Sequence, residues 1–341
     1  MSRIREYAKK TFLAMKNPAG SVQEVFVNAL DRIGEENDCQ YMGVKNVRQI
    51  PADLVKKLEG KGFALHTLDR HSHNGRAVDY NLHNPITGRP MTGSSSGTAI
   101  NVFLGINDLG IGTDGGGSVL APAAAVNCFG FISPLIEAGH MKQYAKLSTD
   151  GIEFYPSIGF VTRDFSTMCK AVKSILPVTG NPGEEEAVIL VSRALASRLE
   201  SPITGEVPAA VPEAGNRREP LIGFLEEQLQ RCDVFADFEE KIDFSGLGDT
   251  VLGHFDPVTA AVQNRSGKGL IRVANMVKAT ALTVPVRELS SCITLYCEST
   301  PEKTGKLLQV AAALVQPEDE LIRRYFRDPA PYFEEGFTWH H

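Results

Sequence analysis

The sequence lacks the features that would place it at a membrane or on a nucleic acid. Its 341 residues contain no run of 18 apolar residues, and the charged start is not followed by the apolar stretch of a secretory leader. Basic residues are not in excess either, since 35 Lys+Arg stand against 41 Asp+Glu for a formal net charge of -6. We therefore expect no membrane association and no nucleic-acid partner, because the latter needs a basic surplus.

Cysteine is scarce and scattered. The six cysteines show neither the spacing of a disulfide framework nor that of a zinc site. This pattern favours a cytoplasmic protein with reduced thiols, and no cofactor or metal is expected. At roughly 100–200 residues per domain, the length alone allows one large domain or two ordinary ones.

Apolar periodicity predicts alternating helices and strands, whereas residues 75–90 are polar and read as a loop. Ser21 has the position of an N-cap for the first helix. The pattern favours an α/β fold with a mixed sheet covered by helices on both faces. Helices are expected over residues 21–36, 52–59, 99–104, 122–126, 163–176, 192–199, 219–231 and 304–315, and strands over 63–67, 109–113, 153–160, 187–191, 281–286 and 291–297.

The glycines with a candidate functional role lie between residues 92 and 130, where two short patterns compete. Gly110, Gly112 and Gly115 match the dinucleotide fingerprint, but a helix does not start easily through the glycine run that follows. The segment 93–97 matches the nucleophile-elbow pattern, which needs a strand directly before it, and a loop is expected there. Three histidines (His66, His71 and His73) suggest a metal site, but no matching carboxylate or thiolate cluster accompanies them.

Two glycine-serine clusters form a more specific pattern together. Residues 115–118 (GGGS) offer consecutive unhindered N–H groups beside a hydroxyl, as an oxyanion hole next to a nucleophile requires. A second cluster, residues 94–96 (SSS), begins 24 residues before Ser118. The structural alternative is a turn followed by a tightly packed helix entry.

These clusters resemble the signature of the amidase signature family. Its pattern reads approximately GGSSGG and then GTDxGGSIRxPAAxCGVVGLKP; here it stands as TGSSSG (92–97) and GIGTDGGGSVLAPAAAVNCFGFISP (110–134). The resemblance implies a Ser–Ser–Lys triad with Ser118 as nucleophile and Ser94, after a cis peptide, as the bridging serine. It also implies an oxyanion hole from the N–H groups of Gly115, Gly116, Gly117 and Ser118.

The resemblance runs nearly end to end. It implies a single amidase-signature-like domain over residues 1–341, with a signature core at 92–134 and a divergent segment at 184–256 that is a candidate substrate-pocket segment. The chain is short for this family. A small-molecule amide substrate is implied, and a homodimer is an open alternative to a monomer.

The catalytic lysine is the weakest point of the resemblance. Lys45 ends a strand-like segment as the family's lysine does, but it stands only 49 residues before Ser94, where the family has 70 or more. In the other alignment Lys45 is a surface residue and the base is absent. Two hypotheses follow: an amidase-type hydrolase or acyl transferase with Ser118, Ser94 and Lys45, or a non-catalytic protein of the same fold that binds a ligand or partner. A nucleotide-binding protein ranks third.

Overall fold

The computed structural model describes residues 2–148, 151–178, 187–198, 210–213, 215 and 217–333. Parts of the divergent segment 184–256 therefore lie outside the described residues, among them residues 199–209.

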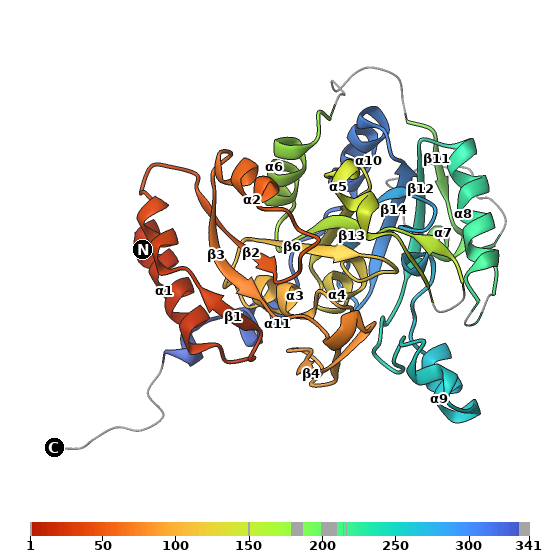
Figure 1. Ribbon diagram of the computed structural model, residues 1–341, viewed down its shortest axis with the longest axis horizontal. Coiled ribbons are helices and arrows are strands. Elements are labelled where there is room, and N and C mark those ends of the chain that lie inside the picture. The colour runs from red at the N-terminus through yellow and green to blue at the C-terminus, as the bar shows by residue number, and fades with distance from the viewer. Residues whose placement is uncertain are drawn as a thin grey trace.

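A twisted mixed sheet runs through the described part of the molecule (Figure 1). Most neighbours are antiparallel, while β2 pairs in parallel with both β3 and β6, and β11 pairs in parallel with β12. The ten strands, in spatial order, are β1 (Val22–Val25), β3 (Phe63–Asp69), β2 (Gln40–Lys45), β6 (Leu109–Asp114), β10 (Ser157–Thr162), β7 (Phe129–Ser133), β13 (Ala279–Pro285), β14 (Cys292–Glu298), β12 (Val234–Glu239) and β11 (Ile189–Val191).

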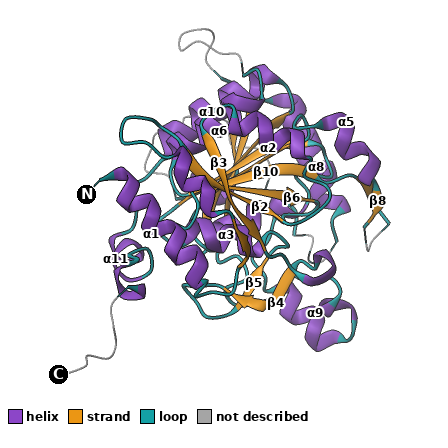
Figure 2. Ribbon diagram, turned by 60° about the vertical axis from the view of Figure 1, so that its left-hand side comes forward, coloured by secondary structure: helices purple, strands orange, loops and turns teal. Residues whose placement is uncertain are grey.

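Helices cover both faces of this sheet, which confirms the expected α/β architecture (Figures 1 and 2). One face packs against α1 (Arg3–Lys16), α3 (Ser96–Phe103), α4 (Leu120–Ala125), α8 (Glu219–Arg231) and α11 (Glu320–Tyr325). The other packs against α2 (Ala52–Glu59), α5 (Ala138–Met141), α6 (Phe165–Ile175), α7 (Arg193–Ala196) and α10 (Pro301–Leu314). Helix α9 (Pro257–Asn264) stands apart near the sheet edge.

The central strands are buried on both sides. Every residue of β6, β7 and β10 is buried, so these strands read as continuous apolar or small-residue runs rather than as alternating patterns. Phe131 and Phe160 stack across neighbouring strands with ring centroids 6.3 Å apart. This rigid centre carries the ends of β2 and β6, where the candidate site is built.

The helix expected over residues 21–36 is wrong. The segment forms the edge strand β1 and then a 3-10 helix, η1 (Val27–Arg32). Pairing with β3 places Val25 opposite Thr67, and Ser21 donates a hydrogen bond to Asn101 Oδ1 at 2.5 Å instead of capping a helix. The apolar residues of this segment recur at helical spacing, but pairing with β3 decides its conformation.

The loop expected over residues 75–90 is also wrong in part. Strands β4 (Val78–His83) and β5 (Pro90–Thr92) form a separate antiparallel hairpin that leads into the second serine cluster. Val78 and Leu82 are buried while Tyr80 is exposed. A few buried apolar side chains therefore anchor this otherwise polar hairpin to the protein.

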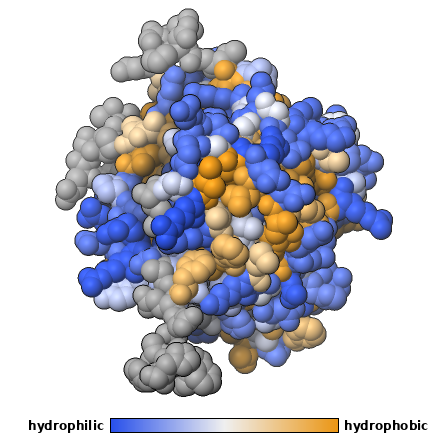
Figure 3. Space-filling view, turned by 90° about the vertical axis from the view of Figure 1, so that its left-hand side faces the viewer, coloured by the Kyte–Doolittle hydropathy of each residue, from blue (hydrophilic) through white to orange (hydrophobic). Residues whose placement is uncertain are grey.

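The amino-terminal helix α1 was not foreseen. It begins at the N-cap Ser2 and buries Tyr7, Leu13 and Ala14, while Phe12 remains 61% exposed. The face that carries α1 shows apolar side chains among polar ones (Figure 3). Of the helices in the described residues, none has the length and apolar character needed to cross a bilayer.

Candidate active site

Lys45 is the last residue of β2 and points into the protein, with only 3% of its surface exposed. Its Nζ donates a hydrogen bond to Ser94 Oγ at 2.6 Å and another to Thr113 Oγ1 at 3.0 Å, and it lies 3.4 Å from Ser95 Oγ. Since β2 and β6 are paired strands, the sheet itself sets the separation of Lys45 and Thr113. The structure therefore brings Lys45 and Ser94 together, as the first alignment implies.

Burial governs the protonation of Lys45. No carboxylate forms an ion pair with its Nζ among the described residues. Burial lowers the pKa of Lys45 to about 7, with a smaller lowering from Lys146 and an opposing effect of Asp114. A substantial fraction of this lysine is consequently neutral near pH 7 and able to accept a proton.

Ser94 follows β5 through a tight turn. Gly93 has a φ of 74°, and a Cβ at this position would lie 2.5 Å from Pro122 Cδ, so both conformation and space call for glycine. The expected cis peptide before Ser94 is absent: the Gly93–Ser94 bond is trans, as are the other peptide bonds of the described residues. The left-handed turn at Gly93 directs the Ser94 hydroxyl to Lys45 with a trans bond.

The glycine run forms a turn between β6 and α4 that is organised around Asp114. The Asp114 carboxylate accepts hydrogen bonds from the N–H groups of Gly117 (Oδ1, 2.7 Å), Val119 (Oδ2, 2.7 Å) and Leu120 (Oδ2, 3.2 Å). Burial raises the pKa of Asp114, while these N–H donors act in the opposite direction. The Gly117 N–H, expected in the oxyanion hole, is thus already engaged with Asp114.

Two N–H groups of the turn remain accessible. Those of Gly115 and Gly116 make no hydrogen bond within the described part of the chain, and both residues are half-buried. Gly117 has a φ of 94°, and a Cβ there would lie 2.7 Å from Ile271 Cγ2. The turn is therefore pressed against residues 270–272, which fixes the direction of its N–H groups.

Ser118 ends the turn and lines the same cavity as Lys45 and Ser94. Its carbonyl accepts a hydrogen bond from the Ser95 N–H at 3.1 Å, which ties the two serine clusters together. Its hydroxyl has no hydrogen-bond partner among the described residues, and the residue is half-buried. The hydroxyl is thus accessible from the cavity, as an attacking group must be.

The cavity has a volume of about 540 Å³, and the charged residues of its wall are mainly basic. Arg76 makes a two-nitrogen contact with Asp249 Oδ2, through Nη2 at 2.6 Å and Nε at 2.8 Å. The Lys268 ammonium pairs with Asp243 at 2.6 Å, and both side chains are almost fully buried. The described cationic residues of the wall are Lys45, Arg76, Lys146, Arg218, Lys268 and Arg272.

The other candidate motifs fall into structural roles. Gly110 and Gly112 lie within β6, and a Cβ at Gly112 would stand 2.6 Å from Ser95 Oγ, so close packing of α3 on the sheet explains that glycine. Ser95, the serine of the elbow pattern, is fully buried, although a strand does precede it. A nucleophile at an elbow is exposed, which Ser95 is not.

The three histidines do not converge. His66 is buried, stacks on Tyr41 with ring centroids 3.9 Å apart, and bonds through Nδ1 to Asn107 Oδ1 at 2.8 Å. The Nδ1 atom of His71 bonds to the Ser72 carbonyl oxygen at 2.9 Å, and His71 lines the cavity. Among the described residues, no three His, Cys, Asp or Glu side chains are grouped so that they could hold a metal ion.

Thr113 and Asp114 were missed as site residues. Thr113 contacts Lys45 Nζ, and Asp114 organises the turn. A signal for Asp114 exists in the sequence, because a carboxylate directly before a run of glycines can accept several backbone N–H groups at once.

Comparison with known proteins adds a partial family match to this geometry. A model of the amidase family matches residues 80–176, which include both serine clusters and the glycine turn. The match covers less than a third of the chain, and it is this segment that is similar to the amidase family. Lys45 lies outside the matched segment, so its place in the site rests on the structure alone.

Two curated plant proteins match part of this chain. "Amidase 1" of Oryza sativa subsp. japonica is 34% identical over 110 residues, or 32% of this chain, and "Amidase 1" of Arabidopsis thaliana is 35% identical over 104 residues, or 29% of this chain. The matched segments correspond to 24% and 22% of those proteins, so the chain spans about a quarter of the length of the curated relatives it matches.

Solved structures share the fold over nearly the whole chain. The native peptide amidase from Stenotrophomonas maltophilia gives a TM-score of 0.57 at 13% identity, covering 92% of this chain and 93% of its own. A bacterial aryl acylamidase gives 0.61 at 13% identity, covering 98% of this chain and 95% of its own. At these identities the likeness establishes the amidase fold.

Proposed function

We propose that this protein hydrolyses a carboxamide C–N bond, or transfers its acyl group, with Ser118 as the nucleophile. The observation that carries the proposal is the 2.6 Å contact between Lys45 Nζ and Ser94 Oγ in the cavity that Ser118 also lines. A serine hydroxyl is a weak nucleophile until a base accepts its proton, and a neutral buried lysine reached through a second hydroxyl supplies that base.

In the proposed acylation, a proton passes from Ser118 through Ser94 to Lys45 and later returns through Ser94 to the leaving nitrogen. Ser118 Oγ attacks the carbonyl carbon and gives its proton to Ser94 Oγ, whose own proton passes to Lys45 Nζ. Collapse of the tetrahedral intermediate breaks the C–N bond, and the proton returns through Ser94 to the leaving nitrogen. Water, or another nucleophile in the case of acyl transfer, then repeats the sequence on the Ser118 ester.

The developing oxyanion needs donors that are already in place. The N–H groups of Gly115 and Gly116 are accessible, and we propose that these two hold the charge. Gly117 has a different part in this proposal: its N–H anchors the turn to Asp114 and so orients its neighbours.

The basic wall supports a negatively charged substrate. Gly116 lies close to Arg218, whose Nη1 would be 3.6 Å from a Cβ at that glycine, and Lys146 is near enough to Lys45 to affect its pKa. Asp249 is the one carboxylate among the described lining residues, and it is paired with Arg76. We propose that the amide substrate carries an anionic group, such as a carboxylate, close to the scissile bond.

Labelling with a fluorophosphonate and hydrolysis of a panel of amides test this function. We expect labelling of Ser118 that is abolished in Ser118→Ala and strongly reduced in Lys45→Met, with no change in Ser197→Ala as a matched serine control. An amide and its carboxylate-bearing analogue should differ in kcat/KM, and Arg218→Gln should reduce that difference. Labelling that survives Ser118→Ala would refute the nucleophile, and a folded wild type that is never labelled would favour a binding protein.

We also propose that residues 1–341 form one domain of this type. A single sheet continues from β1 near the amino terminus to β14, and its two faces carry helices from both halves of the chain, which supports one folding unit.

A further inference from the structure

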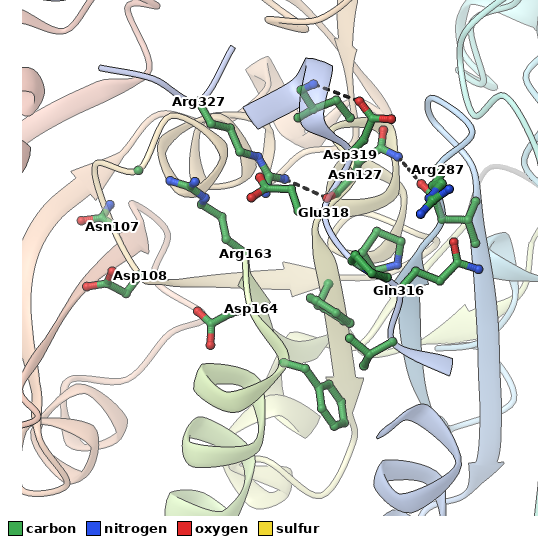
Figure 4. A pocket seen from close by; sticks show the side chains of 18 of the residues that line it. Asn107, Asp108, Asn127, Arg163, Asp164, Arg287, Gln316, Glu318, Asp319 and Arg327 are labelled. Atoms are coloured by element: carbon green, nitrogen blue, oxygen red, sulfur yellow. Dashed lines mark hydrogen bonds and ion pairs between the residues drawn. The ribbon is translucent and has the colours of Figure 1, made fainter. Parts of the chain in front are cut away.

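A second cavity of about 500 Å³ (Figure 4) shares no lining residue with the cavity of Ser118. It lies where β6 begins and β10 ends. Asn107 and Asp108 lie on one side of Arg163, and Arg287 and Gln316 lie on the other side. The Ser118 cavity lies at the opposite ends of the same two strands. Six residues at about 3.3 Å each put roughly 20 Å between the two cavities.

Arg163 is the distinctive group of this cavity. It follows β10 directly and is half-buried, yet its guanidinium has no hydrogen-bond or ion-pair partner among the described residues. Burial and the nearby Arg327 lower its pKa, so the positive charge is held in a place that disfavours it. A guanidinium withdrawn from water without an acceptor is costly, and an incoming anion would recover that cost.

The acidic residues of the wall form hydrogen bonds or ion pairs with groups other than Arg163. Asp108 accepts hydrogen bonds from Lys10, from the Tyr7 hydroxyl at 2.9 Å and from the Tyr41 N–H at 2.9 Å. Asp164 caps α6, accepting from Thr167 N–H at 2.7 Å.

The two acidic residues of the carboxy-terminal segment are engaged as well. Glu318 pairs with Arg327 Nη1 at 2.5 Å, and Asp319 caps α11. Glu6, the remaining acidic residue of the wall, lies 3.8 Å from Lys10 Nζ, so each carboxylate of the wall has another partner.

Arg327 gives a second, independent sign of an unfilled site. Its side chain is 5% exposed and is fixed by Glu318, by the Asn127 carbonyl at 2.9 Å and by the Phe103 ring, 5.0 Å from the guanidinium carbon. Its buried Nε nevertheless has no acceptor. Two arginines of one cavity wall thus carry N–H donors that the described protein atoms do not satisfy.

Gly105 makes room for Arg163. Its φ is 75°, and a Cβ there would lie 2.7 Å from Arg163 Nη1. The cavity wall also contains apolar surface from Phe129, Phe165 and Val286. Such a wall suits a ligand with one charged end and an apolar body.

We infer that this cavity binds a small organic oxyanion, a carboxylate or phosphate monoester with an apolar body, whose head group pairs with Arg163. The planar guanidinium matches the two oxygens of such a head group, and a bidentate contact is the strong form of this interaction. The site is separate from Ser118, so binding does not depend on the proposed catalytic function.

Calorimetric titration of the full chain tests the site with phenyl phosphate and 3-phenylpropanoate, against the uncharged 3-phenylpropanol. We expect both anions, but not the alcohol, to bind, and Arg163→Gln to weaken the binding roughly tenfold or more. Arg193→Gln, an exposed arginine on α7, and Arg218→Gln, in the Ser118 cavity, should leave the dissociation constant unchanged within about twofold.

Two results would overturn the inference. One is absence of anion binding at millimolar concentration, and the other is binding that Arg218→Gln removes and Arg163→Gln leaves intact, which would place the anion beside Ser118. Should Arg163→Gln fail to fold, modification of the wild type by phenylglyoxal decides: phenyl phosphate is expected to protect Arg163, and unprotected modification of Arg163 at saturating phenyl phosphate refutes the site.

Discussion

The Nζ atom of Lys45 and the Oγ atom of Ser94 lie 2.6 Å apart although 49 residues separate them in the sequence. The contact is buried, and Lys45 reaches it from the end of a central strand. A surface lysine could not make it, so the geometry agrees with the alignment in which Lys45 takes the place of the family's base.

Replacing Lys45 by Met should remove the proton acceptor and leave the fold intact. We expect kcat for a hydrolysed amide to fall by about three orders of magnitude or more, because losing one member of a proton-transfer triad has effects of that size. Lys142→Met, on an exposed lysine, is the matched control and should retain full activity. A Lys45→Met protein whose kcat stays within a few-fold of wild type would contradict the proposed role.

The rate should depend on pH through Lys45. Its pKa is lowered to about 7, and only the neutral amine accepts a proton, so kcat/KM should rise as pH increases through about 7 and then level off. A pH–rate profile measured with a substrate that does not titrate in this range tests the expectation. A rate that is flat from pH 6 to pH 8 would argue against a titrating lysine.

Asp114→Asn separates an electrostatic effect from a structural one. Asp114 raises the pKa of Lys45, so removing its charge should shift the rising limb of the profile to lower pH. The turn also loses a charged acceptor for the N–H groups of Gly117 and Val119, so we expect kcat to fall more than KM changes. A lower kcat with an unshifted limb would leave Asp114 with a purely structural role.

Stability should report the pKa of Lys45 without any assay of activity. An unfolded lysine keeps its proton up to its ordinary pKa, whereas the folded one loses it above about 7. Between these values the unfolded state binds more protons, so wild type should gain roughly 1–2 kcal/mol of unfolding free energy relative to Lys45→Met between about pH 7 and pH 9. Urea unfolding at the two pH values measures it, and a constant difference would contradict the lowered pKa.

The buried pair of Lys268 and Asp243 should be sensitive to loss of one partner. Their 2.6 Å contact has side-chain exposures of 4% and 3%, so Lys268→Met leaves a buried carboxylate without its cation. We expect a loss of about 3–5 kcal/mol of unfolding free energy. Lys268→Met combined with Asp243→Asn should recover much of it, and equal stability of the single and double variants would show that the pair is not coupled.

The sequence was informative where a pattern had only one structural solution. Helix α2 and strands β3, β6, β13 and β14 follow their apolar patterns, because each is buried as its periodicity indicates. The expected grouping of the two serine clusters agrees with the contact between Ser95 N–H and the Ser118 carbonyl.

It was uninformative where a distant partner decides the local conformation. The segment 21–36 has a helical period, but pairing with β3 makes its start an edge strand. The engagement of the Gly117 N–H depends on the direction of the Asp114 side chain, which spacing does not reveal. Sequence distance also misled for Lys45, since the parallel pairing of β2 with β6, and not the number of intervening residues, sets its position.

The placement of Lys45 and Thr113 on neighbouring strands has a consequence for protein engineering. Both residues hold their separation through the backbone ladder of β2 and β6, whereas the basic wall of the cavity comes mainly from connecting segments. Those segments can be exchanged without moving the strands that carry the reactive pair. The site thus combines a pair of side chains fixed by the sheet with a recognition surface built from connecting segments, so the proposed chemistry and the proposed substrate preference can be altered independently.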